Sequence, residues 1–469
     1  MRGVIKVFSN VMNRINPRIS SILKRHDKFL YLSYANLIFW YLAMFPGRVG
    51  FDTKLAFELM RNGEGTEWWT GWYWRILQIF TFNGSHIFLF SFCAYSLFWF
   101  VLFRLINVYS SNVYISIRMK FIVTFIPVLP VFAMTIQHDV LFCIGVLGLV
   151  ANEIKLQQDS VSSKYDFKTL LFILPLLLTT KQGVMLLPLL LIRVVWLIGI
   201  KKSLLITVIS LLFVIVPSMG LSNTWTRQSP AIPMLMDIKC AVQHPESRVS
   251  EENWRYLESL LPRDLWKKSE SCKEIDGNEW QRQINFKNLS MIETLRVYLE
   301  LLPDHAEIYL MAHIQRSTTV LPPPFFRGPD NQVNLDYSKP IGENANLALQ
   351  SGSPLLHPSV DDSSVDIRID LLRPLSYLGQ GGVFLINQAS RYWAWGGLWF
   401  WALILHTLTI GRKSYKLAFL RTYWYLISLH FLFFLIGISS TGRHVMPTIC
   451  IGLITLSQSL LAFTLRRKV

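Results

Sequence analysis

The stretch HIFLFSFCAYSLFWFVLF, residues 86–103, contains no Asp, Glu, Lys or Arg. A helix needs about 20 mainly apolar residues to cross the hydrocarbon core of a bilayer, so this run predicts a membrane-crossing helix. Similar runs recur along the chain, and we interpret them all as spans: 29–45, 86–103, 121–136, 140–151, 169–180, 183–198, 204–220, 394–410, 422–438 and 444–464. The sequence therefore predicts an all-α polytopic membrane protein with about ten transmembrane helices.

The overall composition points to a membrane protein and away from nucleic-acid binding. Of the 469 residues, 52% are hydrophobic and 16% are charged, whereas soluble domains carry roughly 25% charged residues. The formal net charge is +16, but the basic residues stand in short clusters between apolar runs and form no single patch or stripe. The lipid bilayer is the expected partner, and no nucleic acid is expected.

The distribution of basic residues predicts the orientation. Segments that fall on the side of the N-terminus hold 22 Lys and Arg, and the short segments on the other side hold six. Cytoplasmic loops carry such an excess. We therefore predict a multi-pass protein of the plasma (inner) membrane with both termini cytoplasmic. The basic N-terminal segment leads into the first run without a small-residue cleavage site, so that run is expected to remain as an anchor.

Four domains follow from this pattern. They are a basic cytoplasmic N-terminus (1–28), a membrane domain of about seven spans (29–220), an extracytoplasmic α-rich domain (221–393) between spans seven and eight, and a C-terminal membrane domain of three spans (394–469). The first outer loop is 46–85.

Within the extracytoplasmic domain, three segments show helical patterns: Glu251–Leu261, Met291–Leu302 and Ala306–Thr319. Cys240 and Cys272 also lie in this domain, and an oxidising compartment would allow them to pair. Elsewhere, four prolines interrupt the group of runs between residues 121 and 198, so kinked or re-entrant helices are expected there. These prolines are Pro127, Pro130, Pro175 and Pro188.

Each short outer segment carries polar residues, although the apolar runs carry very few. The first outer loop contains carboxylates, cations and a Trp-rich stretch, including Asp52, Glu67, Trp68 and Arg75. The next ones contain Gln137-His138-Asp139, Lys181-Gln182 and Arg443-His444. Helix hairpins would bring these segments to one membrane face and form a common site there.

Such a set of side chains suits a reaction on a lipid-linked sugar phosphate. A carboxylate can deprotonate an acceptor hydroxyl, and cations can stabilise charge on a phosphate leaving group. Aromatic faces pack against sugar rings. A sugar carried on a polyprenyl phosphate needs no nucleotide-binding motif, and the sequence has no Walker loop or GxGxxG motif.

Several short motifs resemble bacterial integral-membrane glycosyltransferases of the GT-C type. Pro46-Gly47 before Asp52 resembles their first outer loop, and His138-Asp139 is similar to the start of their fourth span. Lys181-Gln182-Gly183 resembles the break with a basic residue and a glycine between their later spans, and Arg443-His444-Val445-Met446-Pro447 resembles the entry to their last span. Three segments resemble the outer domain of one branch of the group: Asp237-Ile238, His244-Pro245 and the segment from Trp266 to Cys272.

This resemblance implies roles for individual residues. Asp52 is the implied general base, and Asp139 a second catalytic carboxylate that supports Asp52 or helps to hold a divalent metal. Lys181 and Arg443 are the implied ligands of the lipid phosphate. The other residues that we expect to bind substrate are His138, Glu67, Trp68 and Arg75.

The implied reaction is transfer of a sugar from a polyprenyl-phosphate donor to a hydroxyl of a glycan, lipid or protein acceptor on the outer face. Structural roles remain open for the same residues, because Asp52 and Asp139 also suit helix N-termini and Arg443 suits an interface. The histidines lack metal-ligand spacing, and no cofactor is certain.

Three alternatives also remain open. One is a surface-polysaccharide polymerase or ligase that relies on arginines between residues 248 and 282. Another is a non-enzymatic lipid or polysaccharide exporter, against which the scarcity of charges inside the spans argues. The last is an inactive relative that acts in complex assembly, because Glu67-Trp68-Trp69-Thr70-Gly71 stands where the GT-C relatives have Asp-Trp-His-Pro-Pro.

Overall fold

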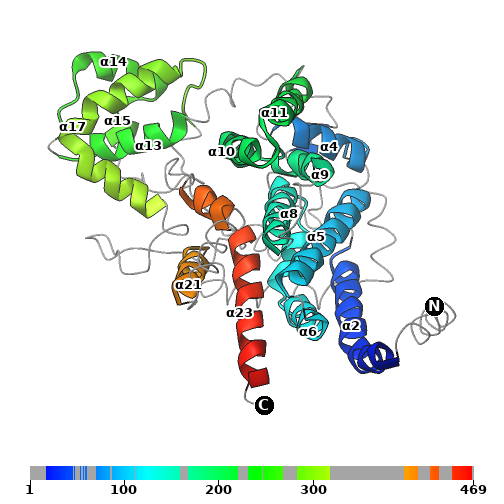
Figure 1. Ribbon diagram of the computed structural model, residues 1–469. Helices are drawn as coiled ribbons and strands as arrows, with labels where there is room; N and C mark the ends of the chain where they lie inside the picture. Colours follow the sequence, from blue (N-terminus) through cyan, green and yellow to red (C-terminus); the bar gives the residue numbers. More distant parts are fainter. Residues whose placement is uncertain are drawn as a thin grey trace.

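The computed structural model describes residues 17–45, 47, 53, 56–57, 59–60, 70–84, 87–110, 112–158, 167–219, 231–245, 247–267, 283–316, 396–409, 423–431 and 446–466. All regular structure in these residues is helical (Figure 1). The predicted all-α class is therefore confirmed for the described part of the chain.

The helices form a bundle and a smaller cluster. The bundle contains α2 (Pro17–Ala43), α4 (Gly71–Thr81), α5 (Phe88–Tyr109), α6 (Val113–Thr124), α7 (Val128–Ala133), α8 (His138–Gln158), α9 (Phe167–Leu177), α10 (Lys181–Ile198), α11 (Ile200–Ile215), the 3-10 turn η1 (Val216–Ser218), α21 (Gly396–Thr409), residues 423–431 and α23 (Met446–Arg466). The cluster contains α13 (Ala231–Val242), α14 (Glu251–Leu260), α15 (Arg263–Lys267) and α17 (Met291–Arg316).

Helix α8 is the centre of the bundle. Every residue from 139 to 153 is buried, as expected of a helix that is apolar on all sides. It packs mainly against α5 and α9 and also contacts α23. On its α9 side, Gly145 lies against Leu177 and Gly148 against Ile173, and these small residues let the two helices approach closely.

Glu153 lies towards the C-terminal end of α8, and residues of two other helices hold its buried side chain. Arg193 of α10 contacts it through two nitrogen–oxygen pairs, at 3.0 and 3.2 Å, and the Tyr425 hydroxyl donates to it at 3.0 Å. Bidentate arginine–carboxylate pairs are among the stronger polar contacts in proteins. Three helices far apart in sequence thus meet around one carboxylate.

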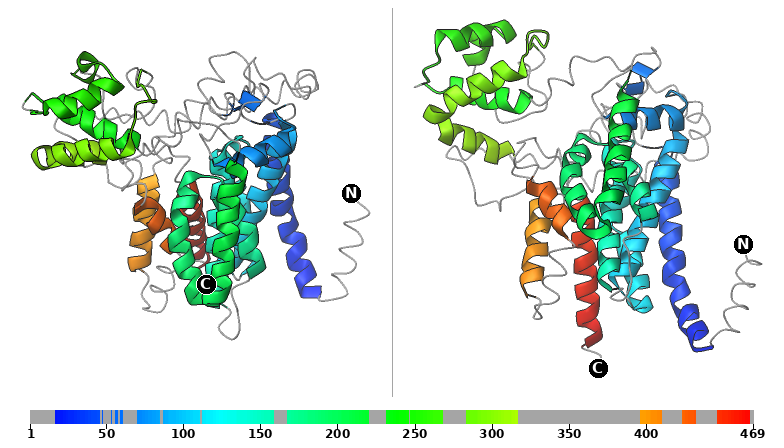
Figure 2. Two further views of the ribbon diagram at one scale, coloured as in Figure 1. Left: turned by 90° about the horizontal axis from the view of Figure 1, so that it is seen from above. Right: turned by 45° about the horizontal axis from the view of Figure 1, so that its top comes forward.

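The bundle has two distinct ends. In Figure 2 the long helices run roughly side by side, and α13 to α17 lie beyond one end of them. The beginning of α2 and the end of α23 lie at the opposite end (Figures 1 and 2). Helices α5 and α8 begin, and α9 and α11 end, on the α13–α17 side, which we call the loop end of the bundle.

Each of the ten predicted spans contains helical residues in its described part. By length and composition, α5 is the one described helix that is long and apolar enough to cross a membrane. A buried core helix of a soluble protein passes the same test, so this is weak support. Shorter apolar stretches lie in α9, α11, α21 and α23. The number of spans therefore stays a prediction.

Several boundaries differ from the predicted ones: α2 begins at Pro17, within the predicted N-terminal segment 1–28, and two further differences have a clear physical cause. The single run predicted at 121–136 is split, since α6 ends at Thr124 and α7 begins after Pro127. Proline lacks the amide hydrogen that would continue the first helix. Helix α8 extends to Gln158, beyond the predicted end at residue 151, because Arg193 and Tyr425 satisfy Glu153 inside the bundle.

The α13–α17 cluster has its own hydrophobic core, which includes Trp254, Leu257 and Trp266. Two of the predicted helical segments correspond to the halves of α17, on either side of Pro303 and the non-helical His305, and the third is α14. The pattern did not predict α13. These residues therefore form a separate α-rich unit, as expected for the described part of 221–393.

Polar contacts stabilise this cluster internally. Buried Lys239 donates to the carbonyl oxygens of Leu265 and Trp266, at 2.6 and 3.2 Å, close to the end of α15. A cation near the last carbonyls of a helix is favourable. Cys240 is disulfide-bonded, and Cys93, Cys143 and Cys450 are free. Cys272, the predicted partner of Cys240, lies outside the described residues.

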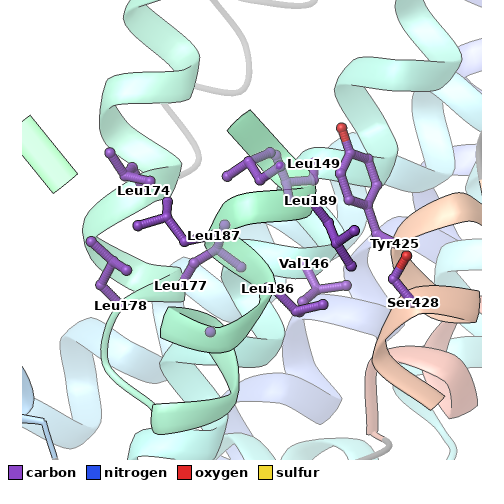
Figure 3. Close-up of a pocket in the computed structure, with 12 residues that line it drawn as sticks. Val146, Leu149, Leu174, Leu177, Leu178, Leu186, Leu187, Leu189, Tyr425 and Ser428 are labelled. Atoms are coloured by element: carbon purple, nitrogen blue, oxygen red, sulfur yellow. The ribbon is translucent and has the colours of Figure 1, made fainter. Parts of the chain in front are cut away.

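A small apolar cavity shows how closely the bundle is packed. Leucines of α9 and α10 face Val146 of α8 and Tyr425 and Ser428 of residues 423–431 (Figure 3). Its volume is about 10 Å³, at the lower limit for a single water molecule. The cavity is therefore too small for a substrate.

The packing of α8 on α9 gives a matched pair of variants. A Cβ at residue 145 would lie 2.9 Å from Leu177 side-chain atoms and 3.0 Å from its backbone nitrogen, whereas at residue 148 it would meet only the flexible end of Ile173 at 3.0 Å. Gly145→Ala should destabilise the protein by about 1–3 kcal/mol through overpacking. Gly148→Ala should be close to neutral, because alanine also favours helix. The measurement is the thermal unfolding midpoint of each variant in detergent. Equal midpoints for the two variants would contradict the prediction.

Candidate active site

The first turn of α8 places two predicted site residues together at the loop end of the bundle. Asp139 is 1% exposed, and one of its oxygens lies 3.5 Å from Nε2 of the partly buried His138. A carboxylate in the first helical turn is stabilised by the helix dipole. Buried Gln137 directly precedes this pair. The α8 N-terminus thus gathers three polar side chains against the apolar core.

Described residues of the first loop reach the chain just before α8. Gly47 packs against Ile136 and Ser91, with φ at +138°, a backbone conformation that favours glycine. The buried Thr53 hydroxyl donates to the Ile136 carbonyl oxygen. Gly47 and Thr53 therefore both lie against the chain just before α8.

Helix α4 covers this end of the bundle. The Thr70 side chain caps it by accepting from the Tyr73 amide. The rings of Tyr73 and His138 are 5.5 Å apart between centroids, and the Trp72 indole donates to the Pro175 carbonyl at 2.9 Å. The Trp-rich stretch is thus in part a packing element that joins α4 to α8 and α9.

The break between α9 and α10 lies at the same point. The Thr179 hydroxyl donates to the Leu176 carbonyl oxygen at 2.7 Å and lies 3.3 Å from the His138 carbonyl oxygen, and Thr180 caps α10 by accepting from the Gly183 amide. Gly183 itself is required, because a Cβ there would lie 1.7 Å from the Leu177 carbonyl oxygen. Lys181, the first residue of α10, therefore follows directly on the segment that contacts α8.

The structure thus brings three of the predicted outer segments together: the first loop with α4, the α8 N-terminus, and the α9–α10 break. Arg75 of α4 lies at this end and donates to Gln78 at 2.8 Å and to the Met219 carbonyl at 3.4 Å. Four predicted site residues lie outside the described residues: Asp52, Glu67, Trp68 and Arg443.

Sequence reasoning missed several residues of this site. Tyr73, Thr53 and Thr179 make the contacts that join the three segments. Tyr73 was visible only as one aromatic residue among several tryptophans, and threonines next to helix termini have no signal beyond their capping tendency. Their roles depend on tertiary proximity, which no local pattern reveals.

Comparison with family models, with curated proteins and with solved structures finds no match. Within the described ranges, no three His, Cys, Asp or Glu side chains are arranged to hold a metal ion. The geometry of the residues themselves must therefore carry the functional argument.

In chemical terms, the loop end combines a buried carboxylate, an imidazole and a phenol with a lysine at the start of the next helix. A buried carboxylate next to an imidazole is suited to accepting or positioning a proton. A cation at the edge of the same cluster is suited to an anionic leaving group. Acid–base chemistry on a substrate with a phosphate is compatible with this set.

The Thr53 hydrogen bond can be tested with two conservative substitutions. Thr53→Val keeps the shape of the side chain and removes the donor to the buried Ile136 carbonyl, which should cost about 1–3 kcal/mol. Thr53→Ser keeps the hydroxyl and should preserve most of the stability. Thermal midpoints of the two purified variants give the answer, and a loss with Thr53→Ser as large as that with Thr53→Val would contradict the prediction.

Proposed function

We propose that the chain is a multi-pass membrane glycosyltransferase that transfers a sugar from a polyprenyl phosphate to an acceptor hydroxyl on the outer membrane face. The observation that carries this proposal is the convergence of the first loop, the α8 N-terminus and the α9–α10 break around buried Asp139 and His138. This places a carboxylate and a lysine-bearing helix start at the same end of an apolar bundle.

In the proposed mechanism the acceptor hydroxyl displaces the phosphate directly. Asp52 removes the acceptor proton, and Lys181 and Arg443 hold the departing lipid phosphate. Asp139 is 1% exposed, which suits a supporting carboxylate that orients His138 more than one that contacts the acceptor. Direct displacement inverts the configuration at the anomeric carbon.

The proposed orientation places the loop end and the α13–α17 cluster outside the cytoplasm, with about ten spans. The disulfide at Cys240 supports it, because disulfides persist in oxidising compartments and are rare in the cytosol. The excess of Lys and Arg in the segments at the opposite end also supports it.

Orientation can be tested with alkaline phosphatase fused after selected residues. Fusions after residues 84, 219 and 316 should be active, because they should lie outside, and fusions after residues 111, 160 and 199 should be inactive. Green fluorescent protein fused at the same points should show the opposite pattern. Alkaline phosphatase activity in the fusion after residue 160 would place that residue outside the cytoplasm and would contradict the common outer site.

Catalysis can be tested in membranes supplied with radiolabelled polyprenyl-phosphate sugars. Asp52→Asn should lower transfer at least about 100-fold, the usual effect of losing an acid–base group, and Asp139→Asn should lower it by a smaller factor, because Asp139 supports His138 and does not contact the acceptor. Asp304→Asn is the control, since Asp304 is exposed on α17 and should leave transfer unchanged. Immunoblots would confirm equal amounts of each variant.

Unchanged transfer by Asp52→Asn would remove Asp52 from the mechanism. Loss of glycan assembly on Arg248→Ala or Arg255→Ala, with Asp52→Asn active, would favour the polymerase alternative. Arg263 is a less useful probe of the polymerase alternative, because its guanidinium group pairs with Glu251 at 3.1 Å and with Glu258 at 3.5 Å. Its replacement would disturb the cluster itself.

A further inference from the structure

A groove runs along α5 on the side that faces α2 and α6. Its volume is about 560 Å³. Aromatic side chains form most of its wall, and two cations lie in it, one from α5 and one from α6. The residues that the argument uses are Tyr34, Leu37, Tyr95, Trp99, Arg104 and Lys120.

The groove is distinct from the candidate active site. Arg104 follows the start of α5 by 16 residues, which corresponds to about 24 Å along a helix. Because α5 begins at the loop end, Arg104 lies towards the opposite end of the bundle. No residue of the proposed transfer mechanism lines this groove.

One region of the groove is polar and positively charged. Arg104 donates to the Asn152 side chain at 3.3 Å, and the Lys120 ammonium lies 5.5 Å from the centre of the Phe103 ring. In the part of the chain that the structure describes, neither cation forms an ion pair with a carboxylate. Two positive charges next to apolar walls call for an anionic group.

The remainder of the groove is apolar and open to the side. Tyr34 is 49% exposed and Phe100 is 63% exposed. The Tyr95 hydroxyl donates to the Leu37 carbonyl at 2.8 Å, so α2 and α5 are joined in the part of the groove nearer the loop end. A chain-like apolar ligand fits between this contact and the two cations.

A second groove shares two residues with the first. It has a volume of about 250 Å³ and lies between α5, α8 and α9. Phe100 and Arg104 line both grooves. Lys168 and Thr169 also line the second groove, and the rest of its lining apart from Arg104 is apolar or glycine. Arg104 therefore stands between two largely apolar channels on the surface of the bundle, an arrangement that suits one headgroup with two acyl chains.

We propose that these grooves bind one anionic phospholipid, with its phosphate on Arg104 and Lys120 and its acyl chains beside Trp99 and Phe100. Guanidinium and ammonium groups bind phosphate through charge-assisted hydrogen bonds, and basic pockets between membrane helices bind anionic headgroups on the cytoplasmic side. The inference rests on the membrane placement proposed above and does not depend on transfer activity.

The test uses the full-length protein in neutral detergent, after extraction with carbonate has shown it to be membrane-integral. Native mass spectrometry measures the binding of phosphatidylglycerol and of phosphatidylcholine. Wild-type protein should bind phosphatidylglycerol preferentially. Arg104→Gln combined with Lys120→Gln should weaken that binding roughly 30-fold, because each basic residue near an anionic lipid contributes about 1 kcal/mol.

Matched variants separate a built site from general surface charge. Lys155→Gln combined with Lys201→Gln removes the same charge from two exposed residues, one near the end of α8 and one near the start of α11, and should leave binding unchanged. Arg104→Lys combined with Lys120→Arg keeps the charge and should retain most of the binding. Inorganic phosphate should not compete at equal concentration.

Four results would overturn the proposal: equal binding of the two lipids by the wild type, full binding by the Gln pair at 104 and 120, an equal loss with the Gln pair at 155 and 201, or competition by inorganic phosphate. A protein that carbonate extracts from the membrane would instead contradict the membrane placement. Failure of this inference and failure of the proposed function are thus separate outcomes.

Discussion

The complete enclosure of α8 is the constraint on which the rest of the structure depends. A helix that is buried from residue 139 to residue 153 must be surrounded by other helices, and α5 and α9 supply most of the surface that covers it. On the α9 side, Gly145 allows the close approach, because a Cβ there would meet both the side chain and the backbone nitrogen of Leu177. The direction of α8 then fixes which chain segments meet at each of its ends.

The two described carboxylates buried in the bundle core, Asp139 and Glu153, lie towards the two ends of α8. Asp139 and Glu153 are separated by 14 residues, about 21 Å along the helix, and each is buried. Glu153 is satisfied by Arg193 and Tyr425, a closed arrangement that joins three helices and leaves little for a substrate. The Asp139 end instead gathers loop segments and helix starts, which is where binding residues usually occur. The two ends therefore differ in kind: one stabilises the bundle, and the other is the candidate site.

Much of the helical framework could be predicted from the sequence, because apolar run length is a local property. Runs such as 86–103 correspond to helices, and so do the patterns in α14 and α17. The extension of α8 through Glu153 could not be predicted, since the partner that allows a buried carboxylate lies 40 residues away on α10. Likewise, the contact of Thr179 with His138 depends on how α9 and α10 pack. Local polarity located the candidate site, but the residues that assemble it become visible only in three dimensions.

Packing accounts for some residues of the motifs and leaves others to be explained by function. Gly47 is needed because the chain passes close to Ile136, and Gly183 because the chain passes close to the Leu177 carbonyl oxygen. Packing alone therefore explains both glycines, and neither is evidence for a chemical function. Asp139 suits a helix N-terminus on electrostatic grounds alone. Lys181 is different, because a cation in the first turn of α10 opposes the helix dipole, and in the proposed orientation it also opposes the charge bias of outer segments. The helix dipole therefore accounts for Asp139 but not for Lys181, so a preference for helix termini explains one of these two charged residues and leaves the other to its surroundings in the fold.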